Sequence, residues 1–211
     1  MKEAILVGGA PGLSLEGVSV ASDTLLIGVD RGTLHLLAKG QVPTVAIGDF
    51  DSVNGQEWEQ IQAACPQIVK LSTEKDETDM EAAIDLAVAK GAEKITIYGA
   101  LGGRIDHTMA NIRLLQKTAG TALETTIADP KNRLRLLVPG THQLFSGTFK
   151  YQSFFAVGKT VENLTLIGLK YPLSGYRLKQ EDIRCTSNES LGEAFTVSFT
   201  TGYLLMIQSK D

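Results

Sequence analysis

Short apolar segments alternate with amphipathic segments over roughly the first 120 residues of the chain. The apolar runs are rich in valine and isoleucine, which is typical of buried strands, and the segments between them repeat apolar residues at helical spacing. We expect strands at Ala4–Val7, Leu25–Val29, Val45–Ile47, Gln67–Leu71 and Lys94–Tyr98, and helices at Thr33–Lys39, Glu77–Lys90 and His107–Lys117. Strands that alternate with helices predict an α/β fold, with a mainly parallel, Rossmann-like sheet and flanking helices.

The pattern changes near residue 129, after which glycines separate strand-like runs and no long amphipathic helix appears. The expected strands are Leu134–Val138, Thr148–Val157, Asn163–Leu169, Ala194–Phe199 and Tyr203–Gln208. Short strands at this spacing favour a smaller antiparallel β-sandwich. We therefore expect two domains, residues 1–128 and 129–211.

Composition and charge narrow the classes of partner. The 211-residue chain has 43% hydrophobic and 21% charged residues, as folded soluble proteins do. Its net charge of −4 offers no basic surface for nucleic acid or for an anionic membrane. Cys65 and Cys185 are too far apart in sequence to suggest a disulfide framework or a Cys-rich zinc site. We expect a cytoplasmic protein that binds small molecules.

Aspartates recur where predicted strands end or predicted helices begin. They are Asp30, Asp49, Asp51, Asp76, Asp79 and Asp106. Parallel sheets gather their ligand-binding loops at the carboxyl ends of the strands, so these side chains should share one edge. Two like charges 4 Å apart repel by about 4 kcal/mol at an effective dielectric constant near 20, so such a cluster is tolerable when divalent cations sit in it.

The chemistry of the cluster points to Mg²⁺, which prefers oxygen ligands that leave room for water and phosphate oxygens. If the Asp49–Asp51 loop is extended, its two carboxylates project to the same side and can face one metal ion. The alternative interpretation is that each aspartate merely caps a turn or a helix, as aspartates commonly do.

A glycine-rich segment, Gly99–Gly103, follows the last predicted strand of the α/β region and precedes a predicted helix. Glycines let a backbone approach phosphates closely, and a helix N-terminus offers free N–H groups. Arg104 adds a guanidinium that suits phosphate oxygens. The segment fits neither of the common glycine-rich phosphate-binding motifs, so by itself it indicates only a turn that could contact phosphate.

Four blocks of sequence occur in a fixed order: Asp30–Gly32, Ile47–Ser52, Asp76–Asp79 and Gly102–His107. Together they resemble the thiamine pyrophosphokinase family, and the resemblance covers essentially the whole chain. In the second domain, Thr186–Asn188 is similar to the Ser-Asn segment with which the family contacts thiamine. One departure is Arg31, where the family often has a small residue, commonly glycine.

The resemblance implies a thiamine diphosphokinase that transfers pyrophosphate from ATP to thiamine, giving thiamine diphosphate and AMP. It implies Mg²⁺ as cofactor, with Asp49, Asp51 and Asp79 as ligands, and Asp51, Asp79, Arg104 and Asp106 as catalytic residues. The expected ATP-binding residues are Asp30, Gly32, Ser52, Asp76, Thr78, Gly102, Gly103, Arg104 and His107, and the expected thiamine-binding residues are Ser187 and Asn188.

The family's members are homodimers with active sites formed between subunits, so the resemblance also implies a homodimer. Two other functions remain open on the sequence alone. One is a Mg²⁺-dependent nucleotide phosphohydrolase that uses the same acids on water, and the other is a non-catalytic nucleotide-binding sensor, since a fold does not fix a function. ATP turnover without thiamine would favour the hydrolase, and binding without turnover would favour the sensor.

Overall fold

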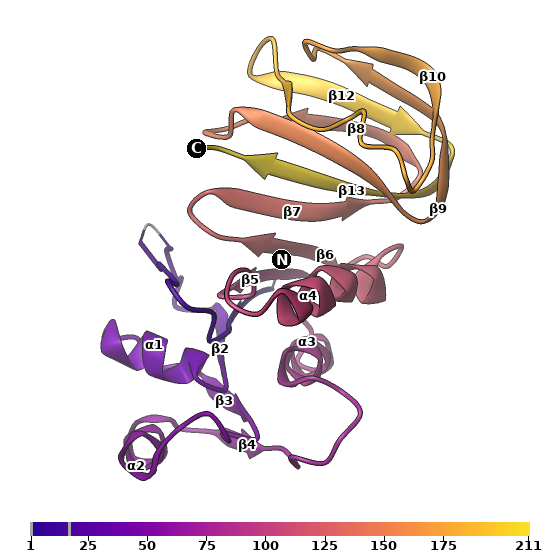
Figure 1. Ribbon diagram of the computed structural model, residues 1–211. Coiled ribbons are helices and arrows are strands. Elements are labelled where there is room, and N and C mark those ends of the chain that lie inside the picture. The colour runs from indigo at the N-terminus through magenta and orange to yellow at the C-terminus, as the bar shows by residue number, and fades with distance from the viewer. Residues whose placement is uncertain (1, 17) are drawn as a thin grey trace. The chain divides into compact units, whose positions relative to one another are not determined.

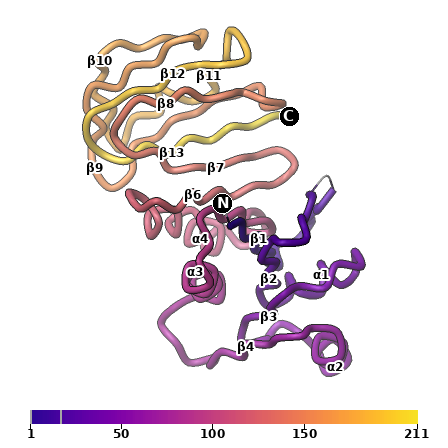
Figure 2. Tube along the Cα trace, turned by 180° about the vertical axis from the view of Figure 1, so that it is seen from behind, coloured from indigo at the N-terminus to yellow at the C-terminus, as the bar shows by residue number. Residues whose placement is uncertain are grey.

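The computed structural model describes residues 2–16 and 18–211. The chain divides into two compact units, Met1–Pro130 and Lys131–Asp211. Each unit has its own set of paired strands (Figures 1 and 2). None of the helices in the described part of the chain combines the length and the apolar character that a membrane crossing requires.

The first unit is a sheet with helices on both of its faces. Its strands follow the order β4-β3-β2-β1-β5-β6, and every pairing between them is parallel. Helices α1 and α2 lie on one side of the strands and α3 and α4 on the other (Figures 1 and 2). The strands are β1 (Glu3–Val7), β2 (Leu25–Val29), β3 (Val45–Gly48), β4 (Ile68–Lys70), β5 (Lys94–Tyr98) and β6 (Glu124–Ala128), and the helices are α1 (Gly32–Ala38), α2 (Gly55–Ala64), α3 (Asp79–Ala89) and α4 (Ile105–Thr118).

Burial explains why these strands could be predicted from the sequence. Both β2 and β3 are buried at every position, and β1 is buried at all but its first residue. Central parallel strands are covered on both faces, so they appear as continuous apolar runs rather than as alternating ones. The predicted strands and helices of this unit are all present, with ends shifted by a few residues.

Two elements of the first unit were not predicted. Helix α2 buries only Ile61 fully, so its apolar periodicity is weak. It starts instead on a capping box: the Asn54 side chain accepts from the Glu57 N–H at 3.0 Å, and Glu57 accepts from the Asn54 N–H at 2.9 Å. Strand β6, Glu124–Ala128, was not among the strands expected from the sequence.

The second unit has only antiparallel pairings among its described strands. They are β7 (Asn132–Leu137), β8 (Gly140–Phe145), β9 (Tyr151–Ile167), β10 (Leu173–Leu178), β11 (Asn188–Glu189), β12 (Ala194–Phe199) and β13 (Thr201–Ser209). Side chains from most of these strands form one hydrophobic core, which includes Phe154, Leu164, Val197 and Met206.

Strand β9 joins the two parts of this unit. Its first half pairs with β11 and β13, and its second half pairs with β10 and β12. The two halves were predicted as separate strands because Gly158 and Asn163 interrupt the apolar pattern. Both residues have positive φ, 75° and 56°, which lets one strand continue through the change of partners.

The prediction of an α/β chain is therefore confirmed at the level of mixed α and β structure. The expectation of a mainly parallel sheet describes the pairings of the first unit and not the chain as a whole. Among the described residues, antiparallel strand pairs outnumber parallel ones, six to five. The sequence led to an overestimate of the parallel part because β8, β10 and β11, all antiparallel, carry too few apolar residues to be recognised as strands.

Candidate active site

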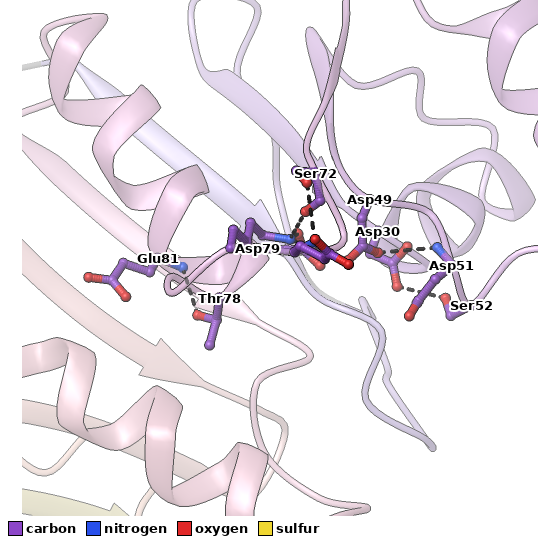
Figure 3. Close-up of polar contacts among 10 residues, drawn as sticks. Asp30, Asp49, Asp51, Ser52, Ser72, Thr78, Asp79 and Glu81 are labelled. Atoms are coloured by element: carbon purple, nitrogen blue, oxygen red, sulfur yellow. Dashed lines mark hydrogen bonds and ion pairs between the residues drawn. The ribbon is translucent and has the colours of Figure 1, made fainter.

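Acidic side chains gather at the carboxyl ends of β2 and β3. Asp30 follows β2, Asp49 and Asp51 follow β3, and Asp79 is the first residue of α3. Figure 3 shows the side chains of Asp30, Asp49 and Asp51 close together, with Ser52 beside Asp30. The parallel register of β2 and β3 brings these strand ends to the same edge of the sheet.

The loop after β3 turns on Phe50. The Phe50 ring is buried and lies 4.9 Å from the Trp58 ring, centroid to centroid, and its backbone has a φ of 60°. The loop is thus not extended at Phe50, contrary to the assumption behind the predicted facing of the two carboxylates. With the side chain of this left-handed residue buried, Asp51 on one side of it is exposed and Asp49 on the other is partly buried. Asp49 Oδ1 closes the turn by accepting from the Asp51 N–H at 3.2 Å.

Asp30 is the most constrained acid of the group. Its φ is 48°, and its N–H donates to the Ile47 carbonyl at 2.8 Å, which ties the end of β2 to β3. The Ser52 hydroxyl donates to Asp30 Oδ2 at 2.6 Å, whereas Asp30 Oδ1 is buried without a hydrogen-bond partner. Burial raises the pKa of Asp30, and the negative charges of Asp79 and Asp49 raise it further.

These three carboxylates fit a divalent cation. Asp30, Asp49 and Asp51 each offer an oxygen, and these oxygens all lie within 4.8 Å of one another. The unpartnered Asp30 Oδ1 is a buried acceptor that a cation would satisfy. The sequence pointed to Asp49, Asp51 and Asp79 as ligands, but the structure groups Asp30 with Asp49 and Asp51, and Asp79 is not one of this group.

Asp79 is joined to the group by Lys75. The Lys75 ammonium lies 3.2 Å from Asp49 Oδ2 and 2.9 Å from Asp79 Oδ1. Burial raises the pKa of Asp49, but the hydrogen bonds from the Asp51 N–H and from Lys75 outweigh it and leave this pKa below its ordinary value. Burial lowers the pKa of Lys75, and the bonds to Asp79 and Asp49 outweigh it in turn, so this pKa is raised. The shifts of these two pKa values, one lowered and one raised, both favour the charged forms of Asp49 and Lys75.

Arg104 and Asp106 lie at the start of α4, where they pair with each other. Arg104 Nε and Nη2 donate to the two Asp106 oxygens at 3.1 and 2.5 Å, and the His107 N–H donates to Asp106 at 2.9 Å. The Arg104 fork, followed by the His107 N–H, lowers the pKa of Asp106 to about 2. All three residues are exposed, so the Arg104 guanidinium is accessible to a ligand anion.

Several expected ATP-binding residues have a structural role that the sequence did not reveal. The Thr78 hydroxyl caps α3 by accepting from the Glu81 N–H at 3.2 Å (Figure 3). Gly32 lies against β1, where a Cβ would meet the Val7 carbonyl oxygen at 1.8 Å.

Other members of the expected set are at the surface. Gly102 and Gly103 have positive φ, 97° and 68°, in the turn before α4. Asp76 is exposed in the loop that leads to α3. These three residues are open to a ligand, and the fold alone gives Asp76 no other function.

The two residues expected to bind thiamine differ in accessibility. Ser187 is exposed, with a φ of 57°. Asn188 is only 3% exposed, and its amide is fully engaged with the backbone: Oδ1 accepts from the Tyr171 N–H at 2.9 Å, and Nδ2 donates to the Tyr171 carbonyl at 2.8 Å. Asn188 therefore fixes the position of Tyr171.

Tyr171 borders a cavity in the second unit. The cavity has a volume of about 350 Å³, and Pro172, Arg184, Thr186 and Asn188 also line it. The Tyr171 side chain is 59% exposed, although large aromatic side chains are usually buried. An exposed ring on a backbone that a buried amide fixes in place is the arrangement expected of a ligand-contacting residue.

Three residues that shape these sites were not found from the sequence. Lys75 reads as a solvated loop lysine, and Tyr171 stands in a short segment without clear periodicity. Arg31, noted only as a departure from the family, donates to the Ser52 carbonyl at 2.8 Å and pairs with Glu57 at 2.9 Å, so it fastens the aspartate loop to α2. The sequence pattern of a capping box at Asn54 and Glu57 was the one signal from which the position of Glu57, the partner of Arg31, could have been predicted.

Comparison with known proteins gives consistent results over both units. The model of the thiamin pyrophosphokinase catalytic domain matches residues 19–127, and that of the thiamin pyrophosphokinase vitamin B1 binding domain matches residues 141–204. The chain is 38% identical to thiamine pyrophosphokinase of Bacillus subtilis over 100% of both chains.

Solved structures agree with these matches. A thiamine pyrophosphokinase structure from Bacillus subtilis is similar with a TM-score of 0.92 at 37% identity, over 100% of each chain. One from Geobacillus thermodenitrificans has a TM-score of 0.89 at 38% identity, over 100% of this chain and 98% of the other. The fold, the acidic strand ends and the full-length matches lead to one conclusion: this chain belongs to the thiamine pyrophosphokinase family.

Proposed function

We propose that this chain transfers the pyrophosphoryl group of ATP to the hydroxyl of thiamine. The reaction forms a bond between the thiamine hydroxyl oxygen and the β-phosphorus of ATP, and it breaks the bond between that phosphorus and the oxygen of the α-phosphate. The products are thiamine diphosphate and AMP. The observation that carries the proposal is the carboxylate group of Asp30, Asp49 and Asp51 at the strand ends, in a chain that matches both family domains.

Asp30, Asp49 and Asp51 would hold Mg²⁺, because they offer three close carboxylate oxygens and one of these residues has a buried oxygen without a partner. When bound, Mg²⁺ neutralises charge on the phosphate oxygens and orients them. Ser52 and the left-handed backbone of Asp30 keep the Asp30 carboxylate in position. Arg31 holds the loop that carries the other two carboxylates.

The remaining polar groups act on the substrates. Transfer of this kind depends on alignment and charge stabilisation more than on covalent chemistry. Arg104 would contact phosphate oxygens, and Asp106 would orient its guanidinium through the two hydrogen bonds already present. The turn of Gly102 and Gly103 exposes backbone close to these groups. The proton of the thiamine hydroxyl passes to a carboxylate, for which Asp51 of the acidic group and Asp79 are the candidates.

The second unit would recognise thiamine. Thiamine carries a cationic thiazolium ring and an aminopyrimidine ring, both of which suit the face of an exposed tyrosine. Tyr171 offers such a face beside the cavity, Asn188 holds it there, and Ser187 adds an exposed hydroxyl. Asn188 would thus contribute to thiamine binding by positioning Tyr171, rather than by the direct contact expected from the sequence.

Three further features belong to the same proposal. Residues 1–128 form a Rossmann-like nucleotide-binding catalytic domain, and residues 129–211 form a β-sandwich that binds thiamine. The working form is a homodimer. The enzyme acts in the cytoplasm on ATP and thiamine, without nucleic acid or membrane as partner.

The proposal is tested by incubating the purified protein with ATP and Mg²⁺, with and without thiamine. AMP should accumulate only when thiamine is present, and EDTA should stop it. ADP and phosphate released without thiamine would instead identify a phosphohydrolase. Binding of ATP without any turnover would identify a sensor. Size-exclusion chromatography with light scattering tests the homodimer.

A further inference from the structure

Lys75 occupies an unusual place for a lysine near a cation site. Its ammonium bridges Asp49 Oδ2 and Asp79 Oδ1 at 3.2 and 2.9 Å, and it donates to the Ser72 carbonyl at 2.9 Å. The Lys75 side chain is only 13% exposed. The ammonium thus donates two hydrogen bonds and forms an ion pair with a third oxygen, and all three are oxygens of the kind that bind a divalent cation.

The bridge separates two sets of carboxylates. Asp49 Oδ1 accepts from the Asp51 N–H within its own loop, while Oδ2 faces Lys75. Asp79 contacts the ammonium and lies outside the group of three close carboxylates at the strand ends. An ammonium group and a divalent cation repel each other, so they cannot both bind Asp49 Oδ2 and Asp79 Oδ1 at the same time.

The Lys75 side chain can also reorient. It lies in the loop between β4 and α3, and its four-carbon stem allows the ammonium to reach other acceptors. A phosphate oxygen is such an acceptor, and it pairs with an ammonium as a point charge.

We infer that Lys75 is a built-in counter-ion, which holds Asp49 and Asp79 together in the metal-free protein and binds a phosphate oxygen once the nucleotide and its metal ion are in place. Releasing the carboxylates makes Asp49 Oδ2 and Asp79 available to the cation. Lys75 is in this sense a positioning residue for the acids and a binding residue for the nucleotide. The inference rests on the proposed use of a metal–nucleotide substrate.

The test removes the charge and keeps the length of the side chain, in Lys75→Met, with Lys75→Gln as a second variant in case the first folds poorly. Lys75→Arg keeps the charge. Lys70→Met is the matched control, because Lys70 lies on the adjacent strand β4 with its ammonium over the Trp58 ring, 5.1 Å from the centroid. Mn²⁺ binding is measured by electron paramagnetic resonance without nucleotide, and binding of a non-hydrolysable Mg·ATP analogue is measured by calorimetry.

The two affinities should change in opposite directions. Loss of two partly buried ion pairs that compete with the cation should tighten Mn²⁺ binding about fivefold. Loss of a charge-assisted hydrogen bond should weaken binding of the nucleotide analogue about tenfold. In EDTA the unfolding temperature of Lys75→Met should fall, and saturating Mg²⁺ should restore it. Lys75→Arg and Lys70→Met should stay close to the wild type.

A merely structural ion pair predicts something else, namely that both affinities weaken together and that stability falls equally with and without Mg²⁺. That result in both neutral variants, or no change in either affinity, overturns the inference. The production of thiamine diphosphate by the wild type is measured separately. If the wild type makes none while the opposite shifts are present, the proposed function fails and the role of Lys75 stands. If it makes product and the opposite shifts are absent, only the role of Lys75 fails.

Discussion

Replacing Gly32 by alanine tests why this position carries glycine. Gly32 is the first residue of α1 and was expected to contact ATP, yet the structure packs it directly on the end of β1. A Cβ there would lie 1.8 Å from the Val7 carbonyl oxygen and 2.8 Å from the Gly8 carbonyl carbon. These are backbone atoms of a buried strand end, so no side-chain rotation relieves the contact.

The expected cost follows from that geometry. Helix α1 must move from β1 by more than about 1 Å to admit the methyl group. Overpacking of a core costs about 1–3 kcal/mol and sometimes more, and the rigid neighbours put Gly32→Ala at the upper end. The better helix propensity of alanine returns at most about 1 kcal/mol. A net loss of about 2–3 kcal/mol should lower the unfolding temperature by roughly 4–12 °C in a chain of this size.

The assay is thermal unfolding, followed by circular dichroism without ligands, with Gly55→Ala as control. Gly55 begins α2 and has no atom within 4 Å of the position of its missing Cβ, so alanine there should be neutral or slightly stabilising. An unfolding temperature for Gly32→Ala equal to that of the wild type would refute the steric account. Lost ATP binding at unchanged stability would return Gly32 to direct contact with the nucleotide.

Three other substitutions probe separate parts of the molecule. Asp51→Asn should reduce thiamine diphosphate formation by about 100-fold or more at an unchanged unfolding temperature, since Asp51 is exposed and its role is electrostatic; a parallel loss of stability would make it a structural residue. Asn188→Ala should raise the KM for thiamine well above any rise in the KM for ATP, because it frees Tyr171; equal rises in both constants in steady-state assays would contradict this. Burial raises the pKa of Cys185 from 9.0 to about 11, so its contribution to stability is complete below pH 9 and is lost as the pH rises through 11. Urea unfolding of the wild type between pH 8 and pH 11 should therefore show about 2–3 kcal/mol of alkaline destabilisation that Cys185→Ala lacks, and identical pH slopes for the two proteins would refute it.

Much of the first unit could be predicted because burial determines its sequence pattern. Strand β2 is apolar or glycine throughout since both of its faces are covered, and α3 shows its buried face at helical spacing. Helix α2 carries little such signal, because its stability at the start comes from hydrogen bonds between Asn54 and Glu57. Strand β9 was divided in two because its change of partners needs residues that weaken a strand pattern.

The location of the acidic site could likewise be predicted, since topology alone brings the ends of β2 and β3 together. Which carboxylate oxygens come close to one another could not be predicted, because that depends on the direction of each side chain. Asp30 lies in the carboxylate group with a left-handed backbone, and Asp79 pairs with Lys75. The same limit applies to Asn188, whose sequence context suggests ligand contact while its amide binds the backbone of Tyr171.

The fate of the β-phosphorus of ATP tests the central claim most directly. With ATP radiolabelled at that atom, Mg²⁺ and thiamine, chromatography should find the label in thiamine diphosphate, with unlabelled AMP formed in equal amount. Attack at the γ-phosphorus would leave the label in ADP and yield thiamine monophosphate, and this result would contradict pyrophosphoryl transfer.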